Sequence, residues 1–473
     1  MRPRGQEYAL GKFRTIGKAI NRVFGNNTHS GNLSLRDPAD PDVFYISASG
    51  SQIGNIVPRD IVPLRISDVS WGDARGSTES TIHRKVLQIE GVGAVVHAHY
   101  LGCTSISFDT REKQMFLRYL GTDTAGREEF LFHPVDLFGS HIVGGVRVAS
   151  YRQPVGSAEM EERIPLYLAE NPLTIVRGHG PFARGVSLED CLYRLSVLEL
   201  SARLILNLRR RGVPVVALQT RLQEQGPESF FPATPHLLDE KGLSVREVED
   251  ETVAEDFRLW LEYNYNNLIG AYGTGSMSHK VAENEMIYCP MSAVPEGMDF
   301  PLTRISLESS KEDCADLRIH KLIYRHTHQN ACMITMSPLA VSEGLAVLAE
   351  RFGEDVLTDS SAQLPYTADD HPFIRPIDAE ALYLNPRLGL VDSSLLADGS
   401  GGNPVLDMLR WYKGCCVIAG YGVVSTGETT LEQAAHNASS AERIARFRAE
   451  VYLNEKLLGG PSLEDAREGQ LPF

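Results

Sequence analysis

The sequence is poor in cysteine, and its few cysteines form no recognisable metal or disulfide pattern. There are seven cysteines in 473 residues, an odd number, and no two are spaced as C-x-x-C. They are Cys103, Cys191, Cys289, Cys314, Cys332, Cys415 and Cys416. This scatter indicates reduced thiols and argues against a disulfide-stabilised secreted domain.

Long apolar runs and an excess of positive charge are also missing. No stretch approaches the roughly 18–20 uncharged apolar residues of a membrane-spanning helix. The opening segment MRPRGQEYALGKFRTIGKAI has no apolar core of signal-peptide length. Lysine and arginine total 46 against 61 aspartates and glutamates, so the formal net charge is −15. Because like charges repel, binding to nucleic acid or to an anionic membrane is disfavoured. We therefore expect a cytoplasmic protein without nucleic-acid or membrane partners.

What the sequence does contain is a domain-sized repeat. Three segments recur in the same order about 240 residues apart. AEDFRLWLEYNYNNLIGAYGTGSMSHK resembles ALGKFRTIGKAINRVFGNNTHSGNLSLR, DLRIHKLIYRHTHQNACMITMSP resembles ESTIHRKVLQIEGVGAVVHAHYL, and VIAGYGVVSTGETTLEQAAHNASSAERIARF resembles IVRGHGPFARGVSLEDCLYRLSVLELSARL. Each copy mixes helical and strand patterns. We predict a tandem duplication, with a first domain at 1–212, a linker at 213–250 and a second domain at 251–473.

The stretch VGAVVHAHY at 92–100 places two histidines one residue apart at the end of an apolar strand. Alternate residues of a strand face the same side, so His97 and His99 should project together. His179, between two glycines in RGHGP, is the best third ligand. Three imidazoles with an open position suit a catalytic divalent metal. Taken alone, H-x-H also fits a pair of partly exposed surface histidines.

Six short motifs in a fixed order resemble a known family. They are GN at 31–32, SASG at 47–50, STE at 77–79, His83, VVHAH at 95–99 and GHG at 178–180. In this order they are similar to the class II (metal-dependent) aldolase/adducin superfamily, whose members include the fuculose-phosphate aldolases. The resemblance implies a mixed α/β fold. It predicts two tandem class II aldolase-like domains, each a central sheet flanked by helices, with a degenerate second copy.

The resemblance also implies the reactive residues. His97, His99 and His179 correspond to the family's metal ligands, with Zn²⁺ as the expected ion and Mn²⁺ or Fe²⁺ as alternatives. Glu79 corresponds to the catalytic acidic residue that moves a proton beside the metal. On the residues alone, a glutamate at the start of a helix is more often one that merely complements the helix dipole.

The small polar loops correspond to the family's substrate-binding segments. The implied substrate-binding residues are Gly31, Asn32, Ser49, Gly50, Ser77 and Thr78. Hydroxyls and backbone N–H groups near a helix start form a natural phosphate site, although serine and glycine also dominate ordinary turns. Two departures leave the substrate open. Gly76 stands where proline is usual before the S-T-E segment, and His29 stands where a small residue is common.

The second copy lacks the three histidines. Over VVHAHY it reads CMITMSP, which puts Ile334 and Met336, or Thr335 and Ser337, at the ligand positions. Tyr421 replaces the histidine of GHG. We therefore predict a pseudo-domain without metal ligands. Because the family assembles as four-fold rings with sites near subunit interfaces, the resemblance implies a homodimer that forms a pseudo-tetrameric ring.

Together these features predict a metal-dependent lyase with a small-molecule substrate. The leading reaction is reversible aldol cleavage of a small hydroxylated carbonyl compound such as a sugar phosphate, in which a dication stabilises the developing enolate. A decarboxylase or dehydratase acting on a small acid or sugar would use the same chemistry. A third alternative is a non-catalytic, adducin-like interaction protein, against which the retained histidines and Glu79 speak.

Overall fold

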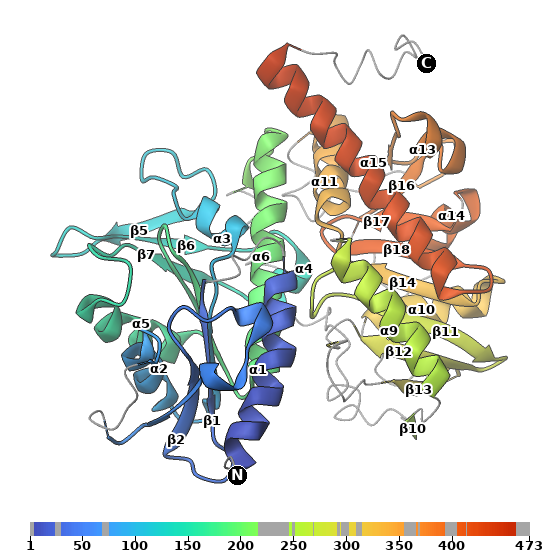
Figure 1. Cartoon of the computed structure of the whole chain (residues 1–473). Coiled ribbons are helices and arrows are strands. Elements are labelled where there is room, and N and C mark those ends of the chain that lie inside the picture. Colours follow the sequence, from blue (N-terminus) through green and yellow to red (C-terminus); the bar gives the residue numbers. More distant parts are fainter. Residues whose placement is uncertain are drawn as a thin grey trace. The chain divides into compact units, whose positions relative to one another are not determined.

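The protein is a mixed α/β structure with two compact units, seen in a computed structural model (Figure 1). The structure describes residues 4–23, 30–68, 75–215, 246–247, 251–267, 269–290, 294, 302–308, 315–353, 366–367, 369–392, 404–412 and 414–459. The first unit comprises the described residues of 4–134 and 142–202. The second comprises 135–141 and the described residues from 203 to 459.

The first unit is built on one nine-stranded sheet. In order across the sheet the strands are β3 (Ile61–Arg65), β2 (Val43–Ser47), β1 (Asn32–Arg36), β4 (Ala94–His97), β9 (Gly180–Gly185), β8 (Leu173–Val176), β7 (Val146–Ala149), β6 (Glu128–Phe132) and β5 (Arg118–Thr122). Every neighbouring pair is antiparallel except β7 with β8.

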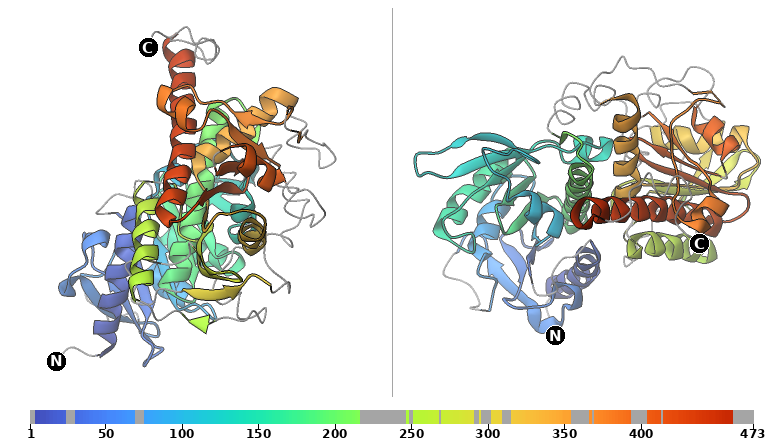
Figure 2. Two further views of the ribbon diagram at one scale, coloured as in Figure 1. Left: turned by 90° about the vertical axis from the view of Figure 1, so that its right-hand side faces the viewer. Right: turned by 90° about the horizontal axis from the view of Figure 1, so that it is seen from above.

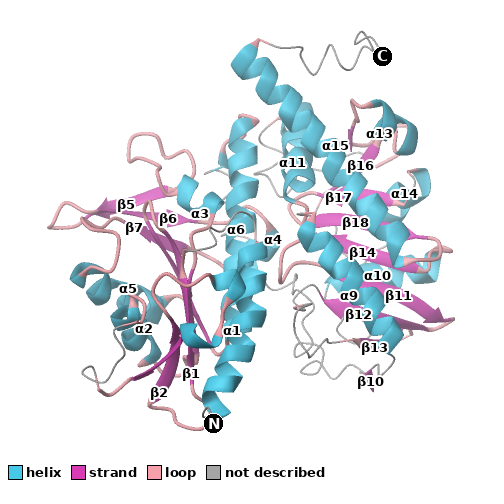
Figure 3. Ribbon diagram, viewed as in Figure 1, coloured by secondary structure: helices cyan, strands magenta, loops and turns pink. Residues whose placement is uncertain are grey.

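The second unit also has a nine-stranded sheet (Figure 3), in which eight strands repeat the order of the first, while β10 is added outside β13 and no strand corresponds to β5. Its strands are β10 (Arg246–Glu247), β13 (Thr303–Ser306), β12 (Glu285–Pro290), β11 (Ser276–Ala282), β14 (Ala331–Thr335), β18 (Gly422–Gly427), β17 (Cys415–Ile418), β16 (Leu388–Val391) and β15 (Phe373–Ile374). Again only one pair, β16 with β17, is parallel. The shared strand order confirms the predicted duplication of an α/β fold.

Helices follow equivalent strands in the two copies. Those of the first copy are α1 (Arg4–Arg22), α2 (Ser80–Leu87), α3 (Leu101–Ile106), α4 (Leu137–Ile142), α5 (Ala158–Glu170) and α6 (Leu188–Arg210), with 3₁₀ turns at Ile53–Asn55 and Pro58–Asp60. Those of the second are α9 (Glu251–Asn266), α10 (Ala315–His326), α11 (Pro338–Phe352), α13 (Ala379–Leu384), α14 (Pro404–Trp411) and α15 (Leu431–Leu458). Figure 2 shows α9 (yellow-green) and α15 (red) side by side along the second sheet. No helix in the described ranges is long and apolar enough to cross a membrane.

Helices α2 and α5 each have an apolar face, which they bury in one cluster with residues of the first sheet. Ile82 and Val86 of α2 and Met160 of α5 pack into one buried cluster with strand residues such as Phe44 and Val95. Because side chains alternate along a strand, the face that buries Val95 also receives His97 two residues later. The predicted strand through Tyr100 ends earlier, at His97.

In each copy, one buried glutamate on the long C-terminal helix binds the start of the helix that follows the central strand. Glu199 on α6 accepts two backbone N–H groups at the start of α3, both at 2.8 Å. Glu442 on α15 accepts two at the start of α11, at 3.0 and 3.4 Å. A carboxylate at these otherwise unpaired N–H groups caps each helix and complements its dipole. Both copies therefore keep the same framework.

A glycine precedes the inner strand of each sheet and allows a close backbone approach. Gly31 has φ +93°, and a Cβ there would lie 2.3 Å from the carbonyl oxygen of His97. Gly275 has φ +78°, and a Cβ there would lie 1.9 Å from the carbonyl oxygen of Ile334. Only glycine fits both the left-handed conformation and the contact. The predicted linker lies mostly outside the described residues, and its boundaries stay a prediction.

We expect Gly275→Ala to destabilise the second unit by about 2–5 kcal/mol, because left-handed strain of about 1–2 kcal/mol adds to overpacking of about 1–3 kcal/mol. Urea unfolding of that unit measures it. Gly353→Ala is the matched control, since Gly353 has φ +86° but no atom within 4 Å of where a Cβ would lie. Equal costs for the two changes would contradict the steric argument.

Candidate metal centre

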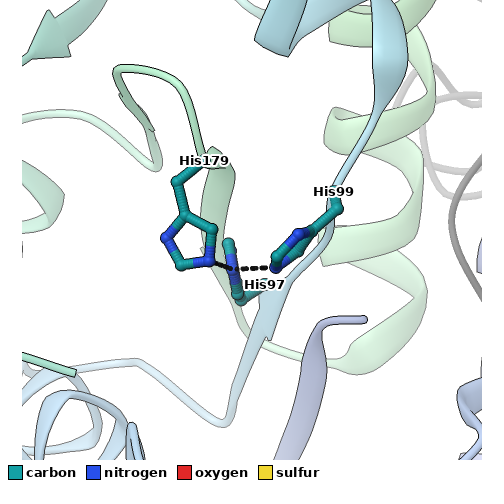
Figure 4. Close-up of side chains that lie close together, drawn as sticks. All are labelled: His97, His99 and His179. Carbon is teal, nitrogen blue, oxygen red and sulfur yellow. Dashed lines mark hydrogen bonds between the residues drawn. The ribbon is translucent and has the colours of Figure 1, made fainter. Parts of the chain in front are cut away.

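Three histidines of the first unit converge on one point (Figure 4). Nε2 of His97 lies 2.9 Å from Nε2 of His99 and 3.2 Å from Nε2 of His179. In the described part of the chain, this is the one group of three or more histidine, cysteine or acidic side chains close enough to share a metal ion. The structure thus brings together the three histidines that the sequence singles out.

The sheet positions these rings. His97 ends β4, and its Nδ1 lies 2.9 Å from the carbonyl oxygen of Pro181. This carbonyl fixes the proton on Nδ1 and leaves the lone pair of Nε2 directed at the other two rings. The ring of Phe182 stacks on His97 with centroids 4.0 Å apart and planes at 12°. Gly180 permits the approach of the third histidine, since a Cβ there would lie 2.2 Å from the carbonyl oxygen of Ala98.

Burial keeps these imidazoles neutral. Desolvation lowers the pKa of His97 well below its ordinary value, and a positive charge on His99 would lower it further. Desolvation also lowers the pKa of His99. The pKa of His179 falls to about 3, first through burial and then through its two histidine neighbours. Neutral imidazole is the form that ligates metals, so protons compete little for these nitrogens near neutral pH.

Glu79 lies beside the histidines and is itself buried, with 3% exposure. Its Oε2 accepts a hydrogen bond of 2.8 Å from Nδ2 of Asn32 and lies 3.9 Å from Nε2 of His97. Its Oε1 has no hydrogen-bond partner among the described residues. Glu79 occupies the N-cap of α2, yet its side chain makes no capping hydrogen bond. The carboxylate is therefore directed into the site and is not used to cap the helix.

The three small polar loops come together near the carboxylate. An isolated bridge pairs Ala48 with Gly76, and Nδ2 of Asn32 donates to Oγ of Ser77 at 3.0 Å. Asn32 and Ser77 are buried and hydrogen-bonded inside the protein. The remaining candidates in these loops, Ser49, Gly50 and Thr78, are exposed. Gly31 acts through backbone packing against β4, and His29 lies outside the described residues.

The residues present fit a divalent cation. Three neutral nitrogens point at a common position, and a buried carboxylate lies next to it, one of whose oxygens has no partner in the described part of the chain. A buried anion without full hydrogen bonding is costly unless a positive charge compensates it. A histidine-based set with one nearby carboxylate matches the donor preferences of zinc and related ions.

Sequence reasoning missed three residues that shape the site. Phe182 stacks on His97. Ser34 holds the buried His83 through a 2.7 Å contact between its Oγ and Nδ1, and burial lowers the pKa of His83 to about 3. The ring of Phe108 lies against Gly178, 3.4 Å from where a Cβ would be. Of the three, only Phe182 could have been found from the sequence. It follows Gly180 by two residues and so falls in β9, the strand that pairs with β4.

The register of the second sheet fixes its equivalent positions. Asn32 pairs with His97 in the first sheet, and Ser276 pairs with Ile334 in the second. Met336 therefore stands where the first copy has His99. Tyr421 directly precedes β18, as His179 directly precedes β9. Of the two registers that the sequence left open, the structure selects Ile334 and Met336.

Hydroxyl groups surround the buried carboxyl in the second copy, which has no histidine at the three equivalent positions. Asp316, the equivalent of Glu79, is fully buried and accepts from the hydroxyls of Tyr288 at 2.8 Å, Tyr421 at 3.1 Å and Ser276. His320, the equivalent of His83, contacts Oγ of Ser276 through Nε2 at 2.7 Å. These groups satisfy the carboxyl internally. Burial raises the pKa of Asp316.

Comparison with known proteins agrees with this description. The model of the Class II Aldolase and Adducin N-terminal domain family matches residues 16–206 and again 263–449. The two matches cover most of the chain, one on each sheet. The chain therefore belongs to this family, with two tandem copies of the domain, as predicted.

The individual relatives named here each match less than half of the chain. A probable bifunctional methylthioribose-1-phosphate isomerase/methylthioribulose-1-phosphate dehydratase of Nocardia farcinica is 28% identical over 42% of this chain, and the match spans 35% of that relative. A methylthioribulose-1-phosphate dehydratase of Leptospira biflexa is 24% identical over 34% of the chain and 78% of its own length. An L-fuculose phosphate aldolase of Methanococcus maripaludis is 25% identical over 37% of this chain and 83% of its own length. Among solved structures, the l-fuculose-1-phosphate aldolase of Thermus thermophilus is 26% identical over 44% of this chain and 95% of its own, with a TM-score of 0.36.

We expect the purified protein, reconstituted with divalent ions, to bind about one ion per chain through its three histidines. Replacing His97 and His99 together with alanine should abolish binding. Elemental mass spectrometry measures the metal content. The matched control replaces His326 and His328, an exposed H-x-H pair in the second copy, and should retain the ion. Two ions per chain, or loss in the control, would contradict the single-site interpretation.

We expect the buried His320 to make the free energy of unfolding decrease as pH falls. Burial lowers its folded pKa to about 3, whereas the unfolded chain takes up a proton below its ordinary value of 6.5. The contribution is therefore complete above pH 6.5 and is lost as pH falls, at up to about 1.4 kcal/mol per pH unit. His320→Gln should flatten the slope of unfolding free energy between about pH 6 and 4.5. His326→Gln, an exposed histidine at the end of the same helix, should leave the slope as it is in the wild type.

Proposed function

We propose that the protein is a metal-dependent lyase that cleaves a bond near the carbonyl of a small hydroxylated compound, with aldol cleavage of a sugar phosphate as the first candidate reaction. One observation carries the proposal: three neutral imidazole nitrogens converge beside a buried carboxylate that keeps one oxygen unpartnered among the described residues. The names of the matched relatives, an L-fuculose phosphate aldolase and methylthioribulose-1-phosphate dehydratases, support lyase chemistry on a sugar phosphate.

His97, His99 and His179 would hold the cation, with zinc as the first choice and manganese or iron as alternatives. A bound divalent ion supplies Lewis-acid stabilisation of negative charge that develops on a substrate oxygen. The chain contributes the arrangement of its ligands. The carbonyl of Pro181 sets the tautomer of His97, and Phe182 fixes its ring plane. Such outer contacts orient ligands and raise their basicity.

Glu79 would move the proton. Its Oε2 is held by Asn32, so the carboxylate keeps one orientation, and its Oε1 remains available for a substrate hydroxyl. In the cleavage direction, a carboxylate that accepts the hydroxyl proton allows the neighbouring carbon–carbon bond to break. In the reverse direction the protonated Glu79 returns that proton to the substrate oxygen.

The exposed backbone and hydroxyl groups of Ser49, Gly50 and Thr78 would receive an anionic group of the substrate. Thr78 lies just before the start of α2, where the helix dipole favours negative charge. The buried pair Asn32 and Ser77 would support these loops from behind. A local anion site of this kind is compatible with a net charge of −15 on the chain.

Dehydration is the second candidate reaction, and the names of several relatives favour it. Loss of water next to a carbonyl also passes through an enolate-like charge, so the same histidines and carboxylate would serve. The adducin-like, non-catalytic alternative gives no account of a buried glutamate directed at three histidines. We further propose that the second copy is a silent pseudo-domain, that the protein works in the cytoplasm and that it acts as a homodimer.

We expect Glu79→Gln to lower turnover by roughly 100- to 10,000-fold, because it removes a proton-transfer group but keeps the shape of the side chain. The metal-loaded protein would be incubated with L-fuculose 1-phosphate and with methylthioribulose 1-phosphate. Mass spectrometry of the products then separates cleavage into two fragments from loss of one water.

Glu90→Gln is the control, an exposed glutamate beyond the other end of α2. It should leave turnover and metal content unchanged. The Glu79→Gln variant must also retain its metal, so that lost turnover reports on proton transfer. If the wild-type, metal-loaded protein turns over neither compound nor any related sugar phosphate, the lyase proposal falls behind the interaction-protein alternative.

A further inference from the structure

His83 lies one turn of α2 after Glu79, and the proposed function gives it no role. Its side chain is fully buried, with 0% exposure. Nδ1 of its ring lies 2.7 Å from Oγ of Ser34. Its Nε2 is also buried and has no hydrogen-bond partner in the described part of the chain. Because an unpaired buried polar atom costs free energy, we expect Nε2 to serve a contact of its own.

The one hydrogen on this ring resides on Nε2. Burial lowers the pKa of His83 to about 3, so the ring is neutral and keeps a single N–H. Among the described residues, the hydroxyl of Ser34 has His83 as its one partner. A buried hydroxyl donates where it can, so Ser34 donates to Nδ1. The hydrogen is therefore left on Nε2, which is a donor without an acceptor.

An acceptor without a donor lies on the same face of the sheet, at Asn32. Asn32 and Ser34 alternate with Leu33 along β1, so their side chains leave the strand on one side. Nδ2 of Asn32 donates to Oε2 of Glu79 and to Oγ of Ser77. Oδ1 of the same amide is buried and has no partner within the ranges that the structure describes.

The second copy contains the same set of positions. By the register of the inner strands, Ser276 stands in the place of Asn32 and Ser278 in the place of Ser34. Nδ1 of His320 lies 2.6 Å from Oγ of Ser278, and its Nε2 lies 2.7 Å from Oγ of Ser276. Both nitrogens of this histidine therefore contact the strand, and Nε2 does so at the position of Asn32.

The histidine is the donor in that second contact. The hydroxyl of Ser276 donates its one hydrogen to the carboxyl of Asp316, so it accepts from Nε2 of His320. Hydrogen bonds thus run from the histidine through the strand residue to the acidic residue. In the first copy the last of these bonds, from Asn32 to Glu79, is present, and Nε2 of the equivalent histidine is the donor that would precede it.

We propose that His83 is a positioning residue for Glu79: its Nε2–H binds Oδ1 of Asn32, directly or through one water molecule, so that the amide keeps Nδ2 on the carboxylate. An amide rotated by half a turn would place its oxygen against the carboxylate and its NH₂ against the hydrogen on Nε2, and both contacts are repulsive. This inference rests on the proposed function, because it explains how the proton-transfer group keeps one orientation. It gives His83 no part in binding the metal.

The first test uses NMR of the full-length wild-type protein with isotope-labelled nitrogen in histidine and asparagine. The spectra should show the hydrogen of His83 on Nε2, and the side-chain NH₂ of Asn32 should be protected from exchange with solvent. A His83 ring with its hydrogen on Nδ1 would overturn the proposal, because Nε2 would then have nothing to donate.

Two variants separate positioning from packing. His83→Leu removes the donor at similar size, whereas His83→Gln keeps a donor and an acceptor. The leucine variant should lower turnover roughly 10- to 100-fold with little change in KM, as is typical when an orienting contact is lost. The glutamine variant should recover most of that loss, and both should retain the ion. Equal losses in the two variants would overturn the proposal.

His320→Leu is the matched control, since it removes an equally buried histidine at the equivalent position of the second copy. It should leave turnover and metal content as in the wild type. A loss of turnover as large as that of His83→Leu would show that the effect comes from general destabilisation, and the proposal would fall.

A double-mutant cycle tests whether His83 acts through Asn32. In an Asn32→Ala background, His83→Leu should cause no further loss of turnover, because the amide that His83 holds is gone. Additive losses would show that the two residues act independently and would overturn the proposal.

The NMR readout also separates this inference from the proposed function. If the wild type turns over no sugar phosphate, but the Asn32 NH₂ loses its protection in His83→Leu and keeps it in His83→Gln, the lyase function fails and the positioning contact stands. If the wild type is active and His83→Leu keeps full turnover with its metal bound, this inference fails alone.

Discussion

The site depends on the register of three antiparallel strands, β1, β4 and β9. In this register His97 pairs with Asn32 on one side and with Phe182 on the other. Asn32 holds Glu79, and Phe182 fixes the plane of the His97 ring. Because side chains alternate along a strand, a slip of one residue would turn His97 to the opposite face and separate it from all of these neighbours. The ladder therefore determines the ligand position, the carboxylate and the stacking ring together.

The two copies solve the same electrostatic problem in different ways. Each buries a carboxylate at the start of the helix that precedes the central strand, and an unpaired buried charge is costly. In the first copy, neutral histidines beside Glu79 create a place for a cation. In the second, the hydroxyls of Tyr288, Tyr421 and Ser276 satisfy Asp316 directly. The change from a ligand site to a closed hydrogen-bond network follows from replacing histidine with apolar residues and tyrosine.

The framework does not depend on the three histidines. The second copy has lost them, yet it keeps the strand order, the left-handed glycine before its inner strand and the buried glutamate that caps the following helix. Selection of a fold by backbone hydrogen bonding and core packing leaves the residues at the strand ends free to change. This freedom explains how one copy can keep the three histidines while the other replaces them.

The sequence by itself determined much of this protein, because its strongest signals are local. Strand alternation placed His97 and His99 on one side, and the repeated order of motifs predicted two α/β domains. It could not decide between Ile334 and Thr335 as the lost ligand position, since a shift of one residue is settled only by pairing across strands. The pairing of Phe182 with His97, the hydrogen bond from Asn32 to Glu79 and the stacking of Phe138 on Tyr421 join residues far apart in the chain. Only the tertiary structure decides such contacts, because packing and desolvation act on neighbours in space.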